Sequence, residues 1–349
     1  MLCASRSPTE PMSRTARSLS LMTVACIATA AAHAGTGTGS LGLDSGLGLL
    51  TFSDMVVSGS SIKGSAAVGG NATIGSYAIN PAAGTNGLVV GGNLGFNSGS
   101  IGGNTVVGGK LTSSYGGSFG GSVAVGGALN ASAGLSVGGG NTTTVWGAIT
   151  GVEPWYPTVT AGTGSFSSGF DFASAQSRLG SLSTQLDLQA TTGAAKDQWG
   201  TLHFDASNLA VAVFDIAAAD ASKNMQINGL AAGASVIINV HGSSVDFGNH
   251  GYTNFGSGQV LFNLPEATSI TFNGGATASF LAPLATVQAG WGSIAGQVIV
   301  DSWRSSVSIN ATAYNGALPI TAAVPEPQTW ALMLGGLLAI GVAMRRKQG

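Results

Sequence analysis

The sequence has little charge. Of its 349 residues, only 12 are Lys or Arg and 14 are Asp or Glu, so charged residues make up 7% of the chain, against about 25% in an average globular protein. Half of the basic residues lie close to the two ends, and the central body is mildly acidic. No basic patch remains there to neutralise phosphate groups, which argues against binding to nucleic acid.

Cysteine is almost absent, since Cys3 and Cys26 both fall within residues 1–34. This segment has the features of a secretory signal peptide, with a basic start and an apolar run over residues 19–32. Removal of the segment would leave a mature chain without thiol or disulfide chemistry. A lipoprotein anchor at Cys26 is disfavoured, because this cysteine lies inside the apolar run and follows a poor lipobox.

The predicted cleavage site has the small-residue pattern that signal peptidase requires. It consists of Ala32 and Ala34 around one histidine, and it makes Gly35 the first residue of the mature protein. The alternative is a buried helix of a cytoplasmic protein, which the basic start and the cleavage pattern disfavour.

The sequence also lacks the common catalytic motifs: a nucleophile elbow, a zinc-binding HExxH and a P-loop. His241, Asp246 and His250 are the closest approach to a metal site, but their spacing matches no metal motif, and we interpret them as loop residues. Asp246 and Glu266 are the one pair of carboxylates that suggests a glycosidase, with Glu266 expected to be a buried acid. We expect no metal and no cofactor.

Glycine, in contrast, is abundant, with 56 residues. Two β-forming residues followed by Gly-Gly recur at Ala67–Gly70, Val89–Gly92, Val106–Gly109, Ala124–Gly127 and Ser136–Gly139. Such short strands must stack on one another to bury their apolar side chains. The period of roughly 20 residues predicts an all-β body with a β-solenoid or β-helix-like fold, in which glycine permits positive φ at the turns.

Asp54, Asn71, Asn93 and Asn104 lie at these turns. Their oxygens could hold Ca²⁺, but calcium-binding nonapeptide repeats need Asp at fixed positions. Capping of the turns is therefore the favoured role of these asparagines.

The chain divides into a lead-in over residues 35–50 and a β body over residues 51–319. The body should begin with a strand over 52–57 and contain one amphipathic helix at about 171–190. Ser168 or Asp171 could cap this helix at its start, and Gly193 could end it. Further strands are predicted at 202–204, 209–216, 225–227, 235–240, 260–262, 269–272, 286–289, 297–299 and 307–309.

The C-terminus has three parts: a linker over residues 320–329, an apolar segment over 330–344 and a basic tail over 345–349. The apolar segment is marginal for a transmembrane helix, and the basic tail should stay cytoplasmic. Pro325, Glu326 and Pro327, this segment, and Arg345 with Arg346 together resemble the PEP-CTERM sorting signal of Gram-negative bacteria. The resemblance implies processing by an exosortase near Pro325–Pro327 and delivery to the outer surface or the extracellular matrix.

The body resembles the choice-of-anchor A family. The residues that carry this resemblance are Phe52–Met55, the Val-Gly-Gly-Asn repeats, Ile237–Gly242, Leu261–Thr268 and Phe280–Pro283. The resemblance implies one body that occurs on different anchoring tails, and adhesive members. It supplies no catalytic residues.

We therefore predict a non-enzymatic, exported structural or adhesive protein that associates with exopolysaccharide or other matrix components. Its partners would be the secretion machinery, an exosortase and the membrane before processing. The Ser-, Thr- and Asn-rich faces would make the contacts, together with the aromatic residues Tyr77, Tyr115, Trp155 and Tyr156. The alternatives are a polysaccharide-acting enzyme and an ice-binding solenoid, which needs regular threonine ranks that the isolated Thr142–Thr144 does not supply.

Overall fold

The computed structural model describes residues 41–80, 86–114, 117–131, 135–151, 159–256 and 258–319. The predicted signal peptide, its cleavage site, the Pro-Glu-Pro motif, the apolar segment 330–344 and the basic tail lie outside these residues. No helix of the described part is long and apolar enough to span a bilayer.

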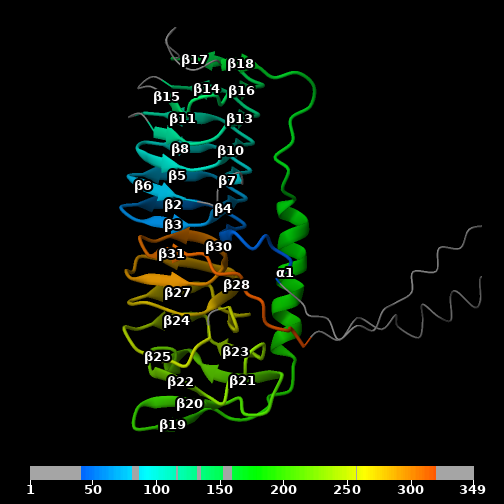
Figure 1. Ribbon diagram of the computed structural model, residues 1–349, viewed down its shortest axis with the longest axis vertical. Coiled ribbons are helices and arrows are strands. Elements are labelled where there is room, and N and C mark those ends of the chain that lie inside the picture. The colour runs from blue at the N-terminus through cyan, green and yellow to red at the C-terminus, as the bar shows by residue number, and fades with distance from the viewer. Residues whose placement is uncertain are drawn as a thin grey trace, which may run out of the picture. The chain divides into compact units, whose positions relative to one another are not determined.

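The fold is a β-solenoid, as predicted: short parallel strands stack coil upon coil into three faces (Figure 1). Face 1 consists of β21 (Val211–Ala217), β23 (Ser235–His241), β26 (Val260–Asn263), the first part of β28 (Ser279–Gln288), the first part of β30 (Val298–Arg304), β1 (Leu47–Thr51), β4 (Ser65–Val68), β7 (Asn86–Val90), β10 (Asn104–Val107), β13 (Val123–Val125), β16 (Thr143–Val145) and β18 (Val159–Ala161).

Face 2 consists of β24 (Ser244–Phe247), β27 (Ser269–Phe272), the second parts of β28 and β30, β2 (Met55–Ser58), β5 (Ala72–Gly75), β8 (Leu94–Phe96), β11 (Leu111–Ser113), β14 (Leu129–Asn130) and β17 (Ile149–Thr150). Face 3 consists of β29 (Ser293–Ala295), β31 (Ser308–Asn310), β3 (Ser61–Lys63), β6 (Tyr77–Ile79), β9 (Gly99–Ile101), β12 (Gly117–Phe119) and β15 (Leu135–Val137). A small fourth sheet, with β19 (Lys196–Gln198), β20 (Thr201–Asp205), β22 (Asn224–Asn228) and β25 (Tyr252–Thr253), belongs to the coils that follow the helix.

The chain does not wind in one direction. Residues 47–161 coil from β1 to β18, and the chain then returns along the helix α1 (Phe172–Asp187) (Figure 1). The coils from β20 onward build back toward the start, so that β30 pairs with β1 and β31 pairs with β3. Leu49 lies opposite Val298 at this junction. Two stacks that are distant in sequence thus become one continuous solenoid.

The glycine pairs of the first four phrases occupy the corners between face 1 and face 2, but not for the predicted reason. The glycines of the first four phrases do not adopt positive φ. A Cβ added to Gly91 would instead lie 2.4 Å from the carbonyl oxygen of Gly69 on the coil below, and one added to Gly108 would lie 2.2 Å from the carbonyl oxygen of Gly91. These glycines are therefore needed because successive coils approach closely at the corner.

Two strand predictions need correction. The fifth phrase does not belong to the same row as the others, because β15 pairs with β12 on face 3. The first strand is β1, which begins inside the predicted lead-in, and the predicted strand over 52–57 begins only at Met55. The fifth phrase is displaced because a full coil contains three strands, so a glycine pair can follow a strand of any face.

The interior of the solenoid is a continuous apolar core. Its aromatic side chains stack along the coils, with the rings of Phe262 and Phe280 5.2 Å apart and nearly parallel. The Phe96 and Phe119 rings meet edge to face at 5.0 Å. All four are fully buried, and burial of such side chains is the main favourable term in folding.

Helix α1 packs on face 1, where it contacts β23, β26 and β28. Its buried side chains Ala175, Leu179, Leu182 and Leu186 form a second core with residues such as Ile237 and Leu281. Asp171 caps the helix as predicted, since its carboxylate accepts a hydrogen bond of 3.0 Å from the Ser174 amide. The helix ends at Asp187 with Leu188 as C-cap, so the predicted stop at Gly193 is wrong.

Candidate binding surfaces

Faces 2 and 3 are the surfaces that α1 leaves open, because the helix contacts strands of face 1 and the first part of β28. Strand residues alternate between the core and the surface. Parallel pairing in register then aligns the outward residues of successive coils into rows that run along the solenoid, with a spacing of about 4.8 Å. The chemistry of each face is set by these rows.

Face 3 carries a row of small side chains. The strand registers align Ser61 with Ala78, Ser100, Ser118 and Ser136 in one direction. In the other direction the row continues to Ser308 and Ser293. The result is a row that presents a hydroxyl group on almost every coil.

Face 2 carries a more varied row, in which Val56, Thr73, Gly95, Thr112, Asn130 and Thr150 are aligned. Its threonines are interrupted by Val56, Gly95 and Asn130. The predicted isolation of Thr142–Thr144 fits this picture. Thr143 is buried, and Thr144 is aligned on face 1 between Ala124 and Thr160, so the row holds two threonines before alanine interrupts it.

The asparagines at the Gly-Gly corners form a ladder. Asp54 accepts a hydrogen bond of 2.8 Å from the Asn71 amide, Asn71 accepts one of 2.9 Å from the Asn93 amide, and Asn93 accepts one of 2.7 Å from the Lys110 amide. Asn104 likewise accepts from the Ser122 amide at 3.0 Å. The asparagine oxygens therefore bond the next coil, whereas the prediction was that they cap their own turns.

The aromatic contact residues were predicted less well. Tyr77 is 1% exposed and faces the core, where burial raises the pKa of its phenol. Tyr115, Trp155 and Tyr156 lie outside the described residues. Sequence reasoning missed Trp291, which is 57% exposed and pairs with Asn273 at the edge of face 2, and Trp199, which is fully exposed at the turn between β19 and β20. The sequence signal for both was a tryptophan next to glycine at a strand end.

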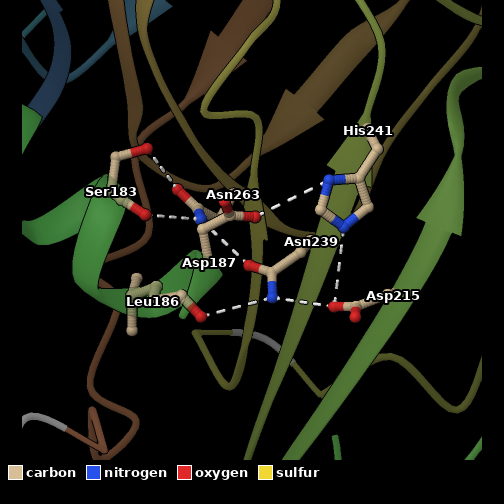
Figure 2. Close-up of polar contacts among 7 residues, drawn as sticks. All are labelled: Ser183, Leu186, Asp187, Asp215, Asn239, His241 and Asn263. Carbon is tan, nitrogen blue, oxygen red and sulfur yellow. Dashed lines mark hydrogen bonds and ion pairs between the residues drawn. The ribbon is translucent and has the colours of Figure 1, made fainter. Parts of the chain in front are cut away.

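His241 belongs to a polar cluster beneath the end of α1, shown in Figure 2. Its two ring nitrogens lie 3.6 Å from a carboxylate oxygen of Asp187 and 3.8 Å from one of Asp215. Asn239 and Asn263 are fully buried beside them and hydrogen-bond to each other at 2.9 Å. This arrangement joins the helix to face 1.

The interpretation of His241, Asp246 and His250 as loop residues is wrong for two of them, because His241 ends β23 and Asp246 lies in β24. Among the described residues, no group of His, Cys, Asp or Glu side chains is arranged to hold a metal ion. Asp246 faces solvent on β24 and accepts a hydrogen bond of 2.9 Å from Asn273. His250 is half-buried against the Tyr252 ring, at 4.6 Å, and burial lowers its pKa.

The alternative pair of carboxylates gains no support. Glu266 is exposed rather than buried, at the corner between β26 and β27, and Asp246 lies across from Thr271 on face 2.

Comparisons with known proteins identify two parts of the chain. A family described as a putative ice-binding-like adhesive domain matches residues 40–311, and the PEP-CTERM protein-sorting motif matches residues 323–347. The predicted sorting signal is thus confirmed, whereas the finer name choice-of-anchor A stays a prediction. No curated protein and no solved structure matches the chain.

Proposed function

The chain belongs to the family of putative ice-binding-like adhesive domains, and we propose that its solenoid attaches a Gram-negative cell to polysaccharide of the surrounding matrix. The adhesive domain and the sorting motif together mark an exported protein of the cell surface, and the motif implies processing by an exosortase. Beyond the family and the sorting motif, the proposal specifies polysaccharide as the ligand and holds that the solenoid does not catalyse a reaction.

The observation that carries this proposal is the pair of open faces with rows of short hydroxyl and amide side chains in register. A polysaccharide presents hydroxyl groups at regular intervals, and a rigid row of donors and acceptors can meet several of them without a change of shape. Trp291 at the edge of face 2 offers the kind of flat apolar surface on which a sugar ring can pack. Weak contacts repeated over many coils would add to firm attachment.

The test is retention of the exported protein, purified from its producing cells, on the exopolysaccharide of those cells, on other glycans and on collagen. We expect retention on polysaccharide and release of no sugar fragments. Trp291→Ala should weaken retention, while Trp199→Ala, which removes an exposed tryptophan from the fourth sheet, should not. Failure of the protein to bind any glycan would refute the proposal, and release of sugar fragments would favour the enzyme.

Ice is the second candidate ligand, because face 3 repeats a hydroxyl group at the coil spacing. Face 3 offers serine, however, and the threonines of face 2 are interrupted. We therefore expect no effect of the protein on the growth of ice crystals, as measured by thermal hysteresis and recrystallisation.

A further inference from the structure

Arg304 stands out among the cations of the body. Of the two arginines in the described residues, Arg178 donates to the backbone carbonyl groups of Leu41 and Gly42, at 2.6 and 3.2 Å. Arg304 is exposed on face 2, and its guanidinium has no hydrogen-bond or ion-pair partner within the described part of the chain. A guanidinium is a rigid fork that matches a carboxylate.

The nearby carboxylates are already engaged. Asp301, three residues before Arg304, accepts hydrogen bonds from Ser53 and Ser302, at 2.8 and 2.9 Å. Asp54 accepts from the Asn71 amide. Arg304 is thus a free positive charge on a body whose acidic residues are otherwise in excess.

Arg304 lines a hollow of about 510 Å³ on face 2, together with Ser58, Thr73, Gly75 and Asn97. Gly75 lies in this hollow, between Ser58 on the coil below and Asn97 on the coil above. A Cβ added to Gly75 would meet no atom within 4 Å. The absence of a side chain at Gly75 leaves room for a ligand on this part of face 2.

The rim of the hollow combines the exposed Val56 with available polar side chains. Among the described residues, the side chains of Ser58, Thr73 and Asn97 have no hydrogen-bond partner, and Ser58 and Asn97 lie two coil spacings apart, about 10 Å. Two hydroxyl groups and one amide can donate to and accept from sugar hydroxyls. With one guanidinium at the end, the hollow combines neutral contacts with a single anion contact.

We propose that this hollow binds a carboxylated sugar unit of an acidic polysaccharide, with its carboxylate on Arg304 and its hydroxyls on Ser58, Thr73 and Asn97. The inference rests on the proposed function and narrows the ligand from polysaccharide in general to the uronic acid class. The row of face 2 would hold the neighbouring sugar units of the same polymer.

The experiment measures binding of the exported protein to polygalacturonate and to its methyl ester, in which the carboxylates are blocked, by isothermal calorimetry. The wild type should bind polygalacturonate at least about tenfold more tightly than the ester, as expected for a hydrogen-bonded charge pair. Arg304→Gln should remove this preference for the free carboxylate. Arg304→Lys, which keeps the positive charge but not the planar fork, should retain part of it. Gly75→Leu should abolish binding by filling the hollow, and the position accepts a Cβ, since no atom lies within 4 Å of it.

Lys110→Gln is the matched control, because it removes an exposed positive charge outside the hollow. It should change the affinity less than about twofold, since single exposed charges are screened. The proposed binding site would be refuted if Arg304→Gln left the affinity for polygalacturonate unchanged, or if Lys110→Gln lowered it equally. The proposed function would still stand in either case. A wild type that binds no polysaccharide of any kind, including that of its own cells, would overturn both.

Discussion

At the scale of single residues, the backbone of one coil restricts the side chains of the next. Gly91 illustrates this restriction, because a methyl group there would lie 2.4 Å from the Gly69 carbonyl oxygen. Gly91→Ala should therefore force the coils apart and lower the free energy of unfolding by about 1–3 kcal/mol. Denaturant unfolding of the exported protein measures this loss.

Gly95→Ala is the matched control for that substitution. Gly95 is in the next strand, β8, and its added methyl group would have ordinary contacts of 3.9 and 4.0 Å. The stability of this variant should equal or slightly exceed that of the wild type, because alanine loses less conformational entropy than glycine. Equal losses for the two variants would contradict the steric explanation.

His250 should make stability depend on pH. Burial is the main effect on this side chain and lowers its pKa below the usual 6.5, although the Gly248 carbonyl group and the Asp246 carboxylate partly oppose it. At a pH well above 6.5 the histidine is neutral in both the folded and the unfolded chain. As the pH falls below 6.5, His250 becomes protonated in the unfolded chain before it does so in the folded chain. The free energy of unfolding should therefore decrease.

His250→Phe tests this dependence, because it keeps a ring against Tyr252 but cannot be protonated. Between about pH 7 and pH 5 its stability should decline less than that of the wild type, as measured by denaturant unfolding. His203→Phe, at a half-exposed position on β20, is the comparison variant. Parallel declines in the wild type and His250→Phe would show that His250 plays no part.

At the scale of elements, the attachment of α1 depends on polar contacts as well as on its apolar side. Asn263 donates to the Ser183 carbonyl oxygen and to Asn239, both at 2.9 Å, and accepts from the Ser183 hydroxyl at 2.6 Å (Figure 2). The Asn239 amide in turn donates to the Leu186 carbonyl oxygen at 3.3 Å. These bonds satisfy backbone groups near the end of the helix.

Asn263→Ala should therefore leave several buried polar groups without partners and cost about 2 kcal/mol or more. Hydrogen exchange should show a selective loss of protection in α1. Asn130→Ala, on the open row of face 2, removes the same amide where water can replace it and should change stability little. A helix that stays fully protected in Asn263→Ala would mean that apolar packing alone holds it.

The elements that the sequence predicted best were those with a local signal. The helix was found from its apolar spacing and Asp171 from its capping position, since both depend on neighbours within one turn. The predicted strands after residue 200 were found from β-branched runs. The sequence analysis placed Ser136–Gly139 on the wrong face and missed the hollow at Gly75. Both features depend on the register between coils, which local sequence patterns do not reveal.

At the scale of the whole chain, the two stacks depend on one another. Strand β1 pairs with β4 on one side and with β30 on the other. The paired residues Leu49 and Val298 are 249 positions apart in the sequence. No local pattern indicates that closure, which is why the sequence predicted a solenoid but not its return along α1. The open faces that the proposed adhesion needs run across this junction, so a ligand on face 2 would contact both stacks.

Sorting is the property of the whole chain that can be tested most directly. A signal peptide cleaved after Ala34 and a PEP-CTERM motif within residues 323–347 predict that the mature protein begins at Gly35 and ends near Pro325–Pro327. Intact mass with terminal peptide mapping, on protein from the cells and from their medium, checks both ends. Replacement of Pro325, Glu326 and Pro327 by alanine should leave the tail in place and the protein in the membrane fraction. Wild-type protein that keeps Arg345 and Arg346 there would contradict the processing, and adhesion would then act from a membrane-held chain.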